Sequence, residues 1–130
     1  MENIHVSVSP GEVLDKITIL EIKSERMTDP EKIANVRTEL ALLQETWTRA
    51  VQADEVVSEL HTQLKEINEA LWEIEDDIRD KERAKEFDQR FIELARSVYF
   101  TNDRRSEVKK KLNLHLGSQI IEEKSYQDYS

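Results

Sequence analysis

Residues 57–78, VSELHTQLKEINEALWEIEDDI, decide the fold. Apolar side chains recur there at alternating spacings of three and four, at positions Val57, Leu60, Leu64, Ile67, Leu71, Ile74 and Ile78. This spacing places them along one side of a helix as a heptad seam. The pattern predicts a helix over residues 54–85, roughly 45 Å long at the usual rise per residue.

The segment before it, residues 30–52, carries a second seam of the same kind. Its apolar positions are Val36, Leu40, Leu43, Trp47 and Ala50. The break at residues 53–54 is so short that the two helices are expected to fold back antiparallel, because a tight turn between helices gives a helical hairpin. The sequence therefore predicts a long antiparallel helical hairpin at the middle of the chain.

Two further helices are expected to flank this hairpin. The first covers residues 10–27, where Ser9 is a candidate N-cap, Pro10 stands at the first helical position and Glu12 would complete a capping box. The last covers residues 87–116, either bent near Thr101 or straight, and ends before Gly117. Residues 4–8 and 119–125 are expected to form a short strand pair that joins the chain ends. The predicted fold is an all-α bundle in one domain.

Composition narrows the class of protein. The chain has 130 residues with two glycines and two prolines, too few for the turns of an all-β protein. The absence of cysteine excludes disulfides, a thiol nucleophile and a cysteine zinc site. The net charge of −9 argues against non-specific nucleic-acid binding, and no apolar run approaches a membrane span. We expect a cytoplasmic protein without a cofactor.

The basic stretch TNDRRSEVKKKLN, residues 101–113, interrupts an otherwise acidic chain. Continuing the inward face of the last helix at 100° per residue places Asn102, Arg105 and Lys109 where core residues would be expected. Arg104, Lys110 and Lys111 then point outward. Unpaired charges on an inward face are costly, so the inward group must meet counter-charges, water or a ligand.

Polar residues also fall on the apolar faces of two other predicted helices. Glu21 lies within the apolar arc of the first helix, with Lys16 beside it, while Glu75 and Arg79 follow the seam of the third. Three readings stay open. Together these inward polar residues form a polar stripe that joins helices through salt bridges, or binds a small anion through Lys16, Arg79, Asn102, Arg105 and Lys109, or is exposed.

An acidic cluster and three histidines offer little support for a metal site. Glu73, Asp76 and Asp80 share an outer face that could bind Mg²⁺, but Arg79 and Lys81 lie among them, which favours a solvated acidic face. The histidines are far apart and show no ligand spacing. No metal site is predicted.

Several stretches resemble a family of small bacterial and phage-borne proteins classed as a domain of unknown function. They are GEVLDKITILEIKSERM, ANVRTEL, LWEIEDDIRDKE, FIELARSVYFTNDRRSEVKKKLN and EEKSY. The likeness covers nearly the whole chain. The family pattern includes Asp15, Lys16, Glu21, Glu75, Arg79, Arg96, Asn102, Arg105 and Lys109, but it implies no catalytic residues.

These observations favour a non-enzymatic binding or assembly module, with a homodimer expected from the long seams. The alternative is a small enzyme acting on an anionic metabolite, with Glu21 or Glu75 as acid or base. Such an enzyme would be comparable to helical chorismate mutases or to metal-dependent nucleotide pyrophosphohydrolases. The chorismate mutase comparison is at the level of fold, since the arginine and lysine spacing of that family is missing.

Overall fold

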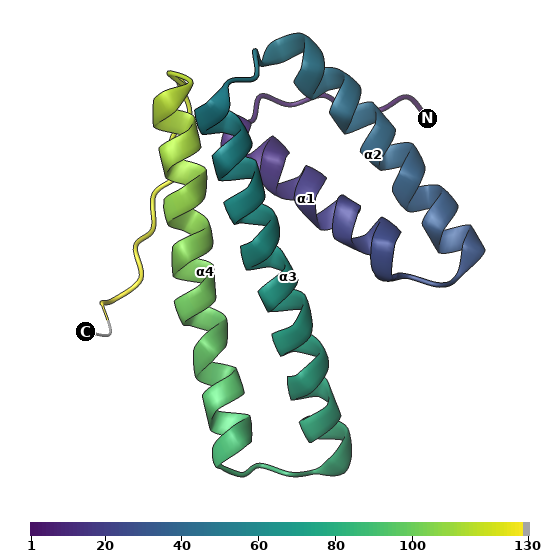
Figure 1. The fold of residues 1–130 in the computed structure, drawn as a ribbon, viewed down its shortest axis with the longest axis vertical. Helices are drawn as coiled ribbons and strands as arrows, with labels where there is room; N and C mark the ends of the chain where they lie inside the picture. The colour runs from purple at the N-terminus through teal and green to yellow at the C-terminus, as the bar shows by residue number, and fades with distance from the viewer. Residues whose placement is uncertain (129–130) are drawn as a thin grey trace.

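The computed structural model describes residues 1–128 and contains four helices. They are α1 (Pro10–Arg26), α2 (Pro30–Ala50), α3 (Glu55–Ala84) and α4 (Gln89–His115). Figure 1 shows α3 and α4 as one long antiparallel pair and α1 and α2 as a second, with α1 between α2 and α3. No strand occurs among the described residues. The predicted all-α class, a long hairpin with two flanking helices, is confirmed.

The long hairpin is formed by α3 and α4, however, and not by the segments 30–52 and 54–85. α2 packs against α1, and no Cα atom of α2 lies within 8 Å of a Cα atom of α3. The reason lies in α1, whose buried positions face several directions, so that α2, α3 and α4 cover it together. These buried positions are Gly11, Leu14, Asp15, Ile17, Thr18, Leu20 and Ile22.

Side-chain caps define where each helix begins. Ser9 Oγ accepts from the backbone N–H of Glu12 at 3.2 Å, and Asp29, Asp54 and Asp88 cap the other three helices in the same way. Each cap satisfies a backbone donor that has no partner within its helix. α4 continues without interruption through Thr101, so the inward face of its first half extends into the basic stretch.

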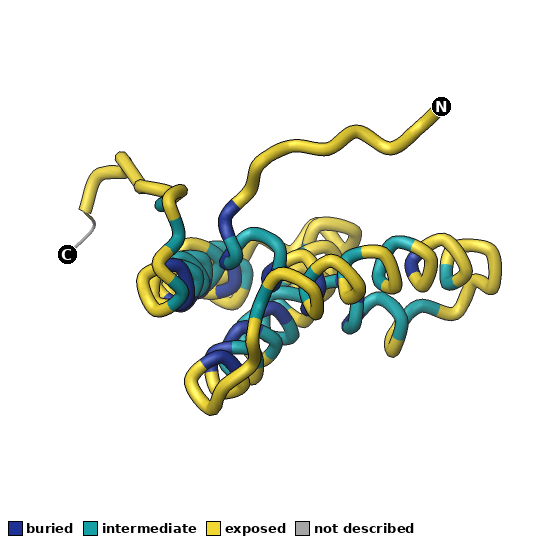
Figure 2. The backbone as a smooth tube through the Cα atoms, turned by 90° about the horizontal axis from the view of Figure 1, so that it is seen from above, coloured by how far each residue is buried: buried dark blue, intermediate teal, exposed yellow. Residues whose placement is uncertain are grey.

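The core lies where α1 crosses the α3–α4 hairpin. Figure 2 shows the buried segments gathered there, while the chain before Ser9 and residues 122–128 are exposed. Three helices supply the buried cluster, whose members are Leu14, Ile17, Val57, Leu60, Leu64, Val108 and Leu112. α2 adds the partly buried Leu40, Leu43 and Trp47 at the edge of this cluster.

The two segments expected to pair as strands do not form a strand. Residues 1–8 are extended and exposed, and a ribbon of two short strands without further support is only marginally stable. The chain ends are nevertheless joined, because Ser9 Oγ donates to Glu122 Oε1 at 3.3 Å. A side-chain contact thus takes the place of the predicted strand pairing.

Candidate functional site

Four polar residues from three helices meet inside the bundle, and we call them the polar centre: Asp15, Thr18, Asn68 and Arg105. The Asp15 side chain is 3% exposed. Its Oδ1 accepts from Arg105 Nε at 2.8 Å and from Asn68 Nδ2 at 2.9 Å, and its Oδ2 accepts from Arg105 Nη2. Asn68 Nδ2 also donates to Thr18 Oγ1 at 2.8 Å. The polar centre therefore ties α1 to both α3 and α4.

The geometry of the polar centre fixes the position of Arg105. A two-bond contact between guanidinium and carboxylate sets both the distance and the plane of the arginine. The carboxylate of Asp15 raises the pKa of Arg105, chiefly through this hydrogen bonding. The Nη1 nitrogen makes one longer contact, to Asn102 Oδ1 at 3.4 Å. The Arg105 side chain is 29% exposed, and Nη1 is its one guanidinium nitrogen without a hydrogen bond to Asp15.

α1 and α4 also approach closely at the N-terminal end of α1. The backbone N–H of Gly11 donates to Asn113 Oδ1 at 2.7 Å. A Cβ atom at Gly11 would lie 2.8 Å from the backbone oxygen of Lys109, so only glycine permits this approach. Lys109 Nζ donates to Glu12 Oε2 at 2.7 Å, and this bond lowers the pKa of Glu12. Glu12 thus binds Lys109 where a capping box with Ser9 was expected.

The basic stretch of α4 has a second set of partners in residues 119–128, which we call the C-terminal segment. Lys109 Nζ lies 3.5 Å from Glu122 Oε2, and Lys110 Nζ lies 3.2 Å from Glu123 Oε2. In a third ion pair the charges are exchanged, because the cation belongs to the C-terminal segment and the carboxylate to α4: Lys124 Nζ lies 2.5 Å from Asp103 Oδ1. Arg105 and Lys109 therefore meet α1 on one side, and Lys109 and Lys110 meet the C-terminal segment on another.

A cavity of about 650 Å³ lies between α4 and the C-terminal segment, and we call it the tail cavity. Its lining holds three cations and one carboxylate, with two tyrosines and several neutral polar groups. The lining residues are Val98, Tyr99, Asn102, Asp103, Arg105, Ser106, Lys109, Lys124, Tyr126 and Gln127.

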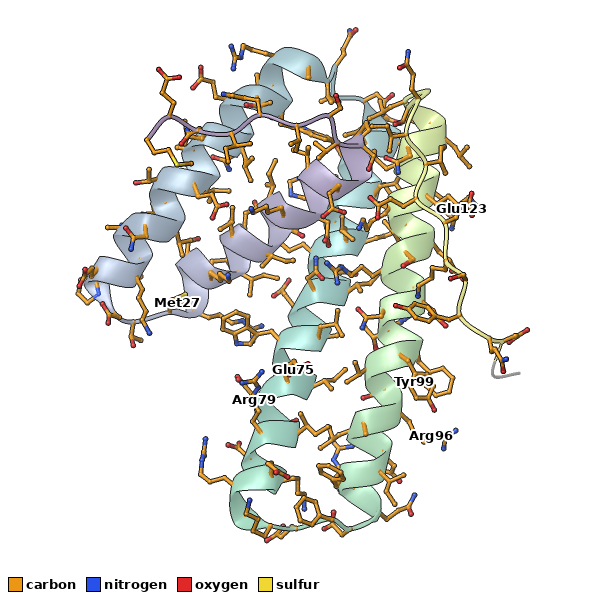
Figure 3. The ribbon with its side chains drawn as sticks, turned by 180° about the vertical axis from the view of Figure 1, so that it is seen from behind. Met27, Glu75, Arg79, Arg96, Tyr99 and Glu123 are labelled. Atoms are coloured by element: carbon orange, nitrogen blue, oxygen red, sulfur yellow. The ribbon has the colours of Figure 1, made fainter. Side chains whose placement is uncertain are left out.

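A second cavity, of about 480 Å³, lies between α1, α3 and α4, and we call it the three-helix cavity. Figure 3 shows Glu75 and Arg79 on α3, below Met27 at the end of α1. Tyr99 lies at the other edge of the hairpin, on the side of the C-terminal segment (Figure 3). The lining residues are Ile19, Ile22, Lys23, Asn68, Leu71, Trp72, Glu75, Asp76, Arg79, Val98, Asn102 and Arg105.

The structure brings five of the predicted site residues to these two cavities. Asn102 and Arg105 line both of them. Lys109 lines the tail cavity, whereas Glu75 and Arg79 line the three-helix cavity and contact each other at 3.4 Å along one face of α3. The stripe predicted from the sequence is therefore divided at Arg105 into two sites.

The other two predicted residues lie away from both cavities. Lys16 Nζ pairs with Glu39 Oε2 on α2 at 2.7 Å, and both side chains are largely exposed. Glu21 Oε1 is hydrogen-bonded to His61 Nε2 on α3 at 2.8 Å. These contacts join α1 to its neighbours and bring neither residue to Arg79 or Arg105.

Of the predicted acidic face of α3, Glu73 and Asp80 are in ion pairs, and Asp76 lines the three-helix cavity. Glu73 Oε1 lies 3.5 Å from Arg26 Nη2, and Asp80 Oδ1 lies 3.1 Å from Arg83 Nη1. Within residues 1–128 no group of three or more histidine, aspartate or glutamate side chains is arranged to hold a metal ion.

Asp15, the carboxylate at the middle of the polar centre, was named in the family pattern, but the spacing of residues was not used to assign it to the stripe. Asp15 follows Leu14 directly and shares a helix face with Thr18 and Ile22, which was a detectable signal of a polar group facing inward. Asn68 interrupts the seam of α3 in the same way. Lys124 and Tyr126 carried no such signal, because the C-terminal segment has no periodic pattern from which its contacts could be inferred.

The fold and its polar centre define a small helical bundle whose charged interior residues are paired across helices. The chain belongs to a family of unknown function, DUF6165, which matches residues 4–129. The family resemblance predicted from the sequence motifs is thereby confirmed. No curated protein and no solved structure matches the chain. None of the helices within residues 1–128 combines the length and apolarity needed to cross a bilayer.

Proposed function

We propose that the protein is a non-enzymatic binding module that takes up a small anion, a phosphate or carboxylate, in the tail cavity. One observation carries the proposal: Arg105, Lys109 and Lys124 line this cavity together with a single carboxylate, Asp103. An excess of positive charge in a concave site favours an anionic ligand. The volume of about 650 Å³ is typical of small-molecule sites.

The cations in this cavity differ in how firmly they are held. Arg105 is fixed by the buried Asp15, so it offers its remaining N–H groups without having to reorganise. Lys109 is 14% exposed and is held by Glu12 at 2.7 Å, while its contact with Glu122 is longer, 3.5 Å. Exposed ion pairs contribute little to stability. An anion that replaced Glu122 beside Lys109 would therefore cost little free energy, because the Lys109–Glu122 ion pair that it breaks is weak.

The C-terminal segment supplies the other wall of the site. Lys124 and Tyr126 come from it and lie against each other, with Lys124 Nζ 5.4 Å from the centre of the Tyr126 ring. The contacts between this segment and α4 are mainly exposed ion pairs, which contribute little to stability, so we propose that the segment moves aside to admit a ligand and closes again over it. The polar centre then acts as the rigid support of a site with one movable wall.

The enzymatic alternative would require an acid or base within reach of the bound anion. Glu75 lines the three-helix cavity, not the tail cavity, and Glu21 lines neither of them. The carboxylate in the tail cavity, Asp103, lies 2.5 Å from Lys124 Nζ. This arrangement favours binding over proton transfer. The homodimer and the cytoplasmic location stay predictions, and light scattering after size-exclusion chromatography tests the first.

Thermal unfolding in the presence of inorganic phosphate tests the proposal. At about ten times its Kd, a ligand specific for the folded state stabilises by about 1.4 kcal/mol, which raises the Tm by about 6 °C in a chain of this size. Sodium chloride at matched ionic strength provides the baseline, because surface ion pairs also respond to salt.

Matched variants locate the effect. Lys109→Gln and Lys124→Gln each remove one lining cation and should abolish most of the shift. Lys111→Gln removes the same charge from an exposed position on α4 outside the cavity, so the shift should persist. An equal shift in all three variants would mean non-specific screening, and the absence of any shift with phosphate and with acetate would refute the proposal.

A further inference from the structure

The three-helix cavity combines charges of both signs with an apolar wall. Lys23, Arg79 and Arg105 line it together with Glu75 and Asp76. Its remaining wall is mainly apolar and consists of Ile19, Ile22, Leu71, Trp72 and Val98. At about 480 Å³ it is large enough for a small organic molecule. An apolar wall with a few polar groups at its edge is the usual composition of such a site.

Most of the charged groups in this cavity are already paired. Arg105 is bound by Asp15, and Arg79 lies 3.4 Å from Glu75. Lys23 and Asp76 have no ion-pair partner within the described residues 1–128. The cavity thus presents one uncommitted cation, on α1, and one uncommitted anion, on α3.

We infer that the three-helix cavity binds a zwitterion with an apolar side group, of the α-amino acid class. Its carboxylate would pair with Lys23 and with Nη1 of Arg105, and its ammonium group with Asp76. The side group would lie against Trp72 and Leu71, where burial of apolar surface favours binding. A simple anion would meet Glu75 and Asp76, and a simple cation would meet Lys23 and Arg79, so a ligand with both charges fits best.

This site goes beyond the proposed function and shares part of its lining with the tail cavity. Lys23, Trp72 and Asp76 belong to the three-helix cavity alone, whereas Lys109 and Lys124 belong to the tail cavity alone. Val98, Asn102 and Arg105 are shared, so they are left unchanged in the experiment. The experiments can then refute the proposal for one site while the proposal for the other stands.

Trp72 provides a direct readout of binding. The chain contains two tryptophans, and Trp47 packs at the core edge on α2, so Trp47→Phe leaves Trp72 as the single reporter. Titration with L-leucine should give a saturable change in Trp72 fluorescence. N-acetyl-L-leucine lacks the ammonium group and L-leucinamide lacks the carboxylate. Each should bind about ten-fold more weakly, because each loses a charge-assisted contact. The same titration with L-phenylalanine tests a larger side group.

Matched variants test the assigned contacts. Asp76→Asn and Lys23→Gln should each weaken L-leucine binding about ten-fold, while Asp77→Asn and Lys32→Gln, exposed positions outside the cavity, should leave it unchanged. Should Trp47→Phe impair folding, the two indole N–H resonances of the unmodified protein report the same titrations.

Three results would overturn the inference. They are the absence of a saturable response to both amino acids, equal binding of the zwitterion and its two derivatives, and equal effects of Asp76→Asn and Asp77→Asn. If phosphate raises the Tm as expected but Trp72 fluorescence does not respond to the amino acids, this site is refuted and the proposed function stands. If Trp72 responds to the amino acids but phosphate leaves the Tm unchanged, the proposed function alone is refuted.

Discussion

Replacing Arg105 with methionine isolates the structural role of the polar centre. The substitution keeps much of the aliphatic volume but leaves Asp15 buried, with the Asn68 amide as its remaining side-chain donor. Stranding a buried charge in this way typically costs about 3–5 kcal/mol. Because Arg105 is itself 29% exposed, water can reach the vacated space, so we expect about 3 kcal/mol, the lower end of that range. For a chain of this length the loss corresponds to a fall in Tm of about 12 °C.

Thermal unfolding followed by far-ultraviolet circular dichroism, without added ligand, measures this loss. Arg104→Met is the matched control, since Arg104 is exposed on the same turn and has no ion-pair partner within residues 1–128. It should change stability by less than about 0.5 kcal/mol. Adding Asp15→Asn to Arg105→Met removes the stranded charge, so the double variant should recover part of the loss. Equal stability of Arg105→Met and Arg104→Met would refute the reasoning.

Three further predictions follow from local contacts. Gly11→Ala should destabilise the protein by about 1–3 kcal/mol, because the added Cβ would press on the Lys109 backbone oxygen. Urea unfolding with an unchanged m-value measures this loss. An unchanged midpoint of the urea transition would contradict it. The pKa of Glu12 is lowered in the folded state by Lys109, so its contribution is complete above the usual value of 4.5 and is lost as the pH falls through the lowered folded value. The Tm difference between the unmodified protein and Glu12→Gln should therefore shrink on acidification below that pH, and a constant difference would count against the ion pair. Asp54→Ala removes the cap on the Val57 N–H, 2.8 Å away, together with the 2.8 Å contact to His115 Nε2 on α4. It should lower the Tm more than Asp77→Ala does, and equal melting temperatures would show that neither contact contributes.

The sequence predicted the four helices because each carries its own local signals. N-capping side chains and the prolines at the starts of α1 and α2 act within a few residues, and so do the heptad spacings of α2 and α3. The pairing of helices was predicted wrongly for α2. Its seam was matched to α3 because the connection is short, but α1 lies between them. Periodicity shows that a helix has an apolar face, but it does not show which other helix covers that face.

The candidate site was predicted in part for a similar reason. Continuing the helical phase of α4 correctly placed Asn102, Arg105 and Lys109 on its inward side, since phase is a property of one straight helix. Their partners could not be read in this way. Asp15 lies 90 residues from Arg105 along the chain, and neither residue alone indicates the other.

The amino-acid sequence by itself determined the number of helices, their approximate ends, the inward face of α4 and the membership of a family. These properties depend on backbone capping and on residue spacing within one segment. Tertiary structure decided that Arg105 is held by Asp15, that the stripe is divided into two cavities, and that Glu21 and Lys16 lie outside both. Those outcomes depend on how α1 crosses the hairpin at Gly11 and on where the C-terminal segment lies against α4. Contacts between segments far apart in the chain arise only from packing the whole molecule.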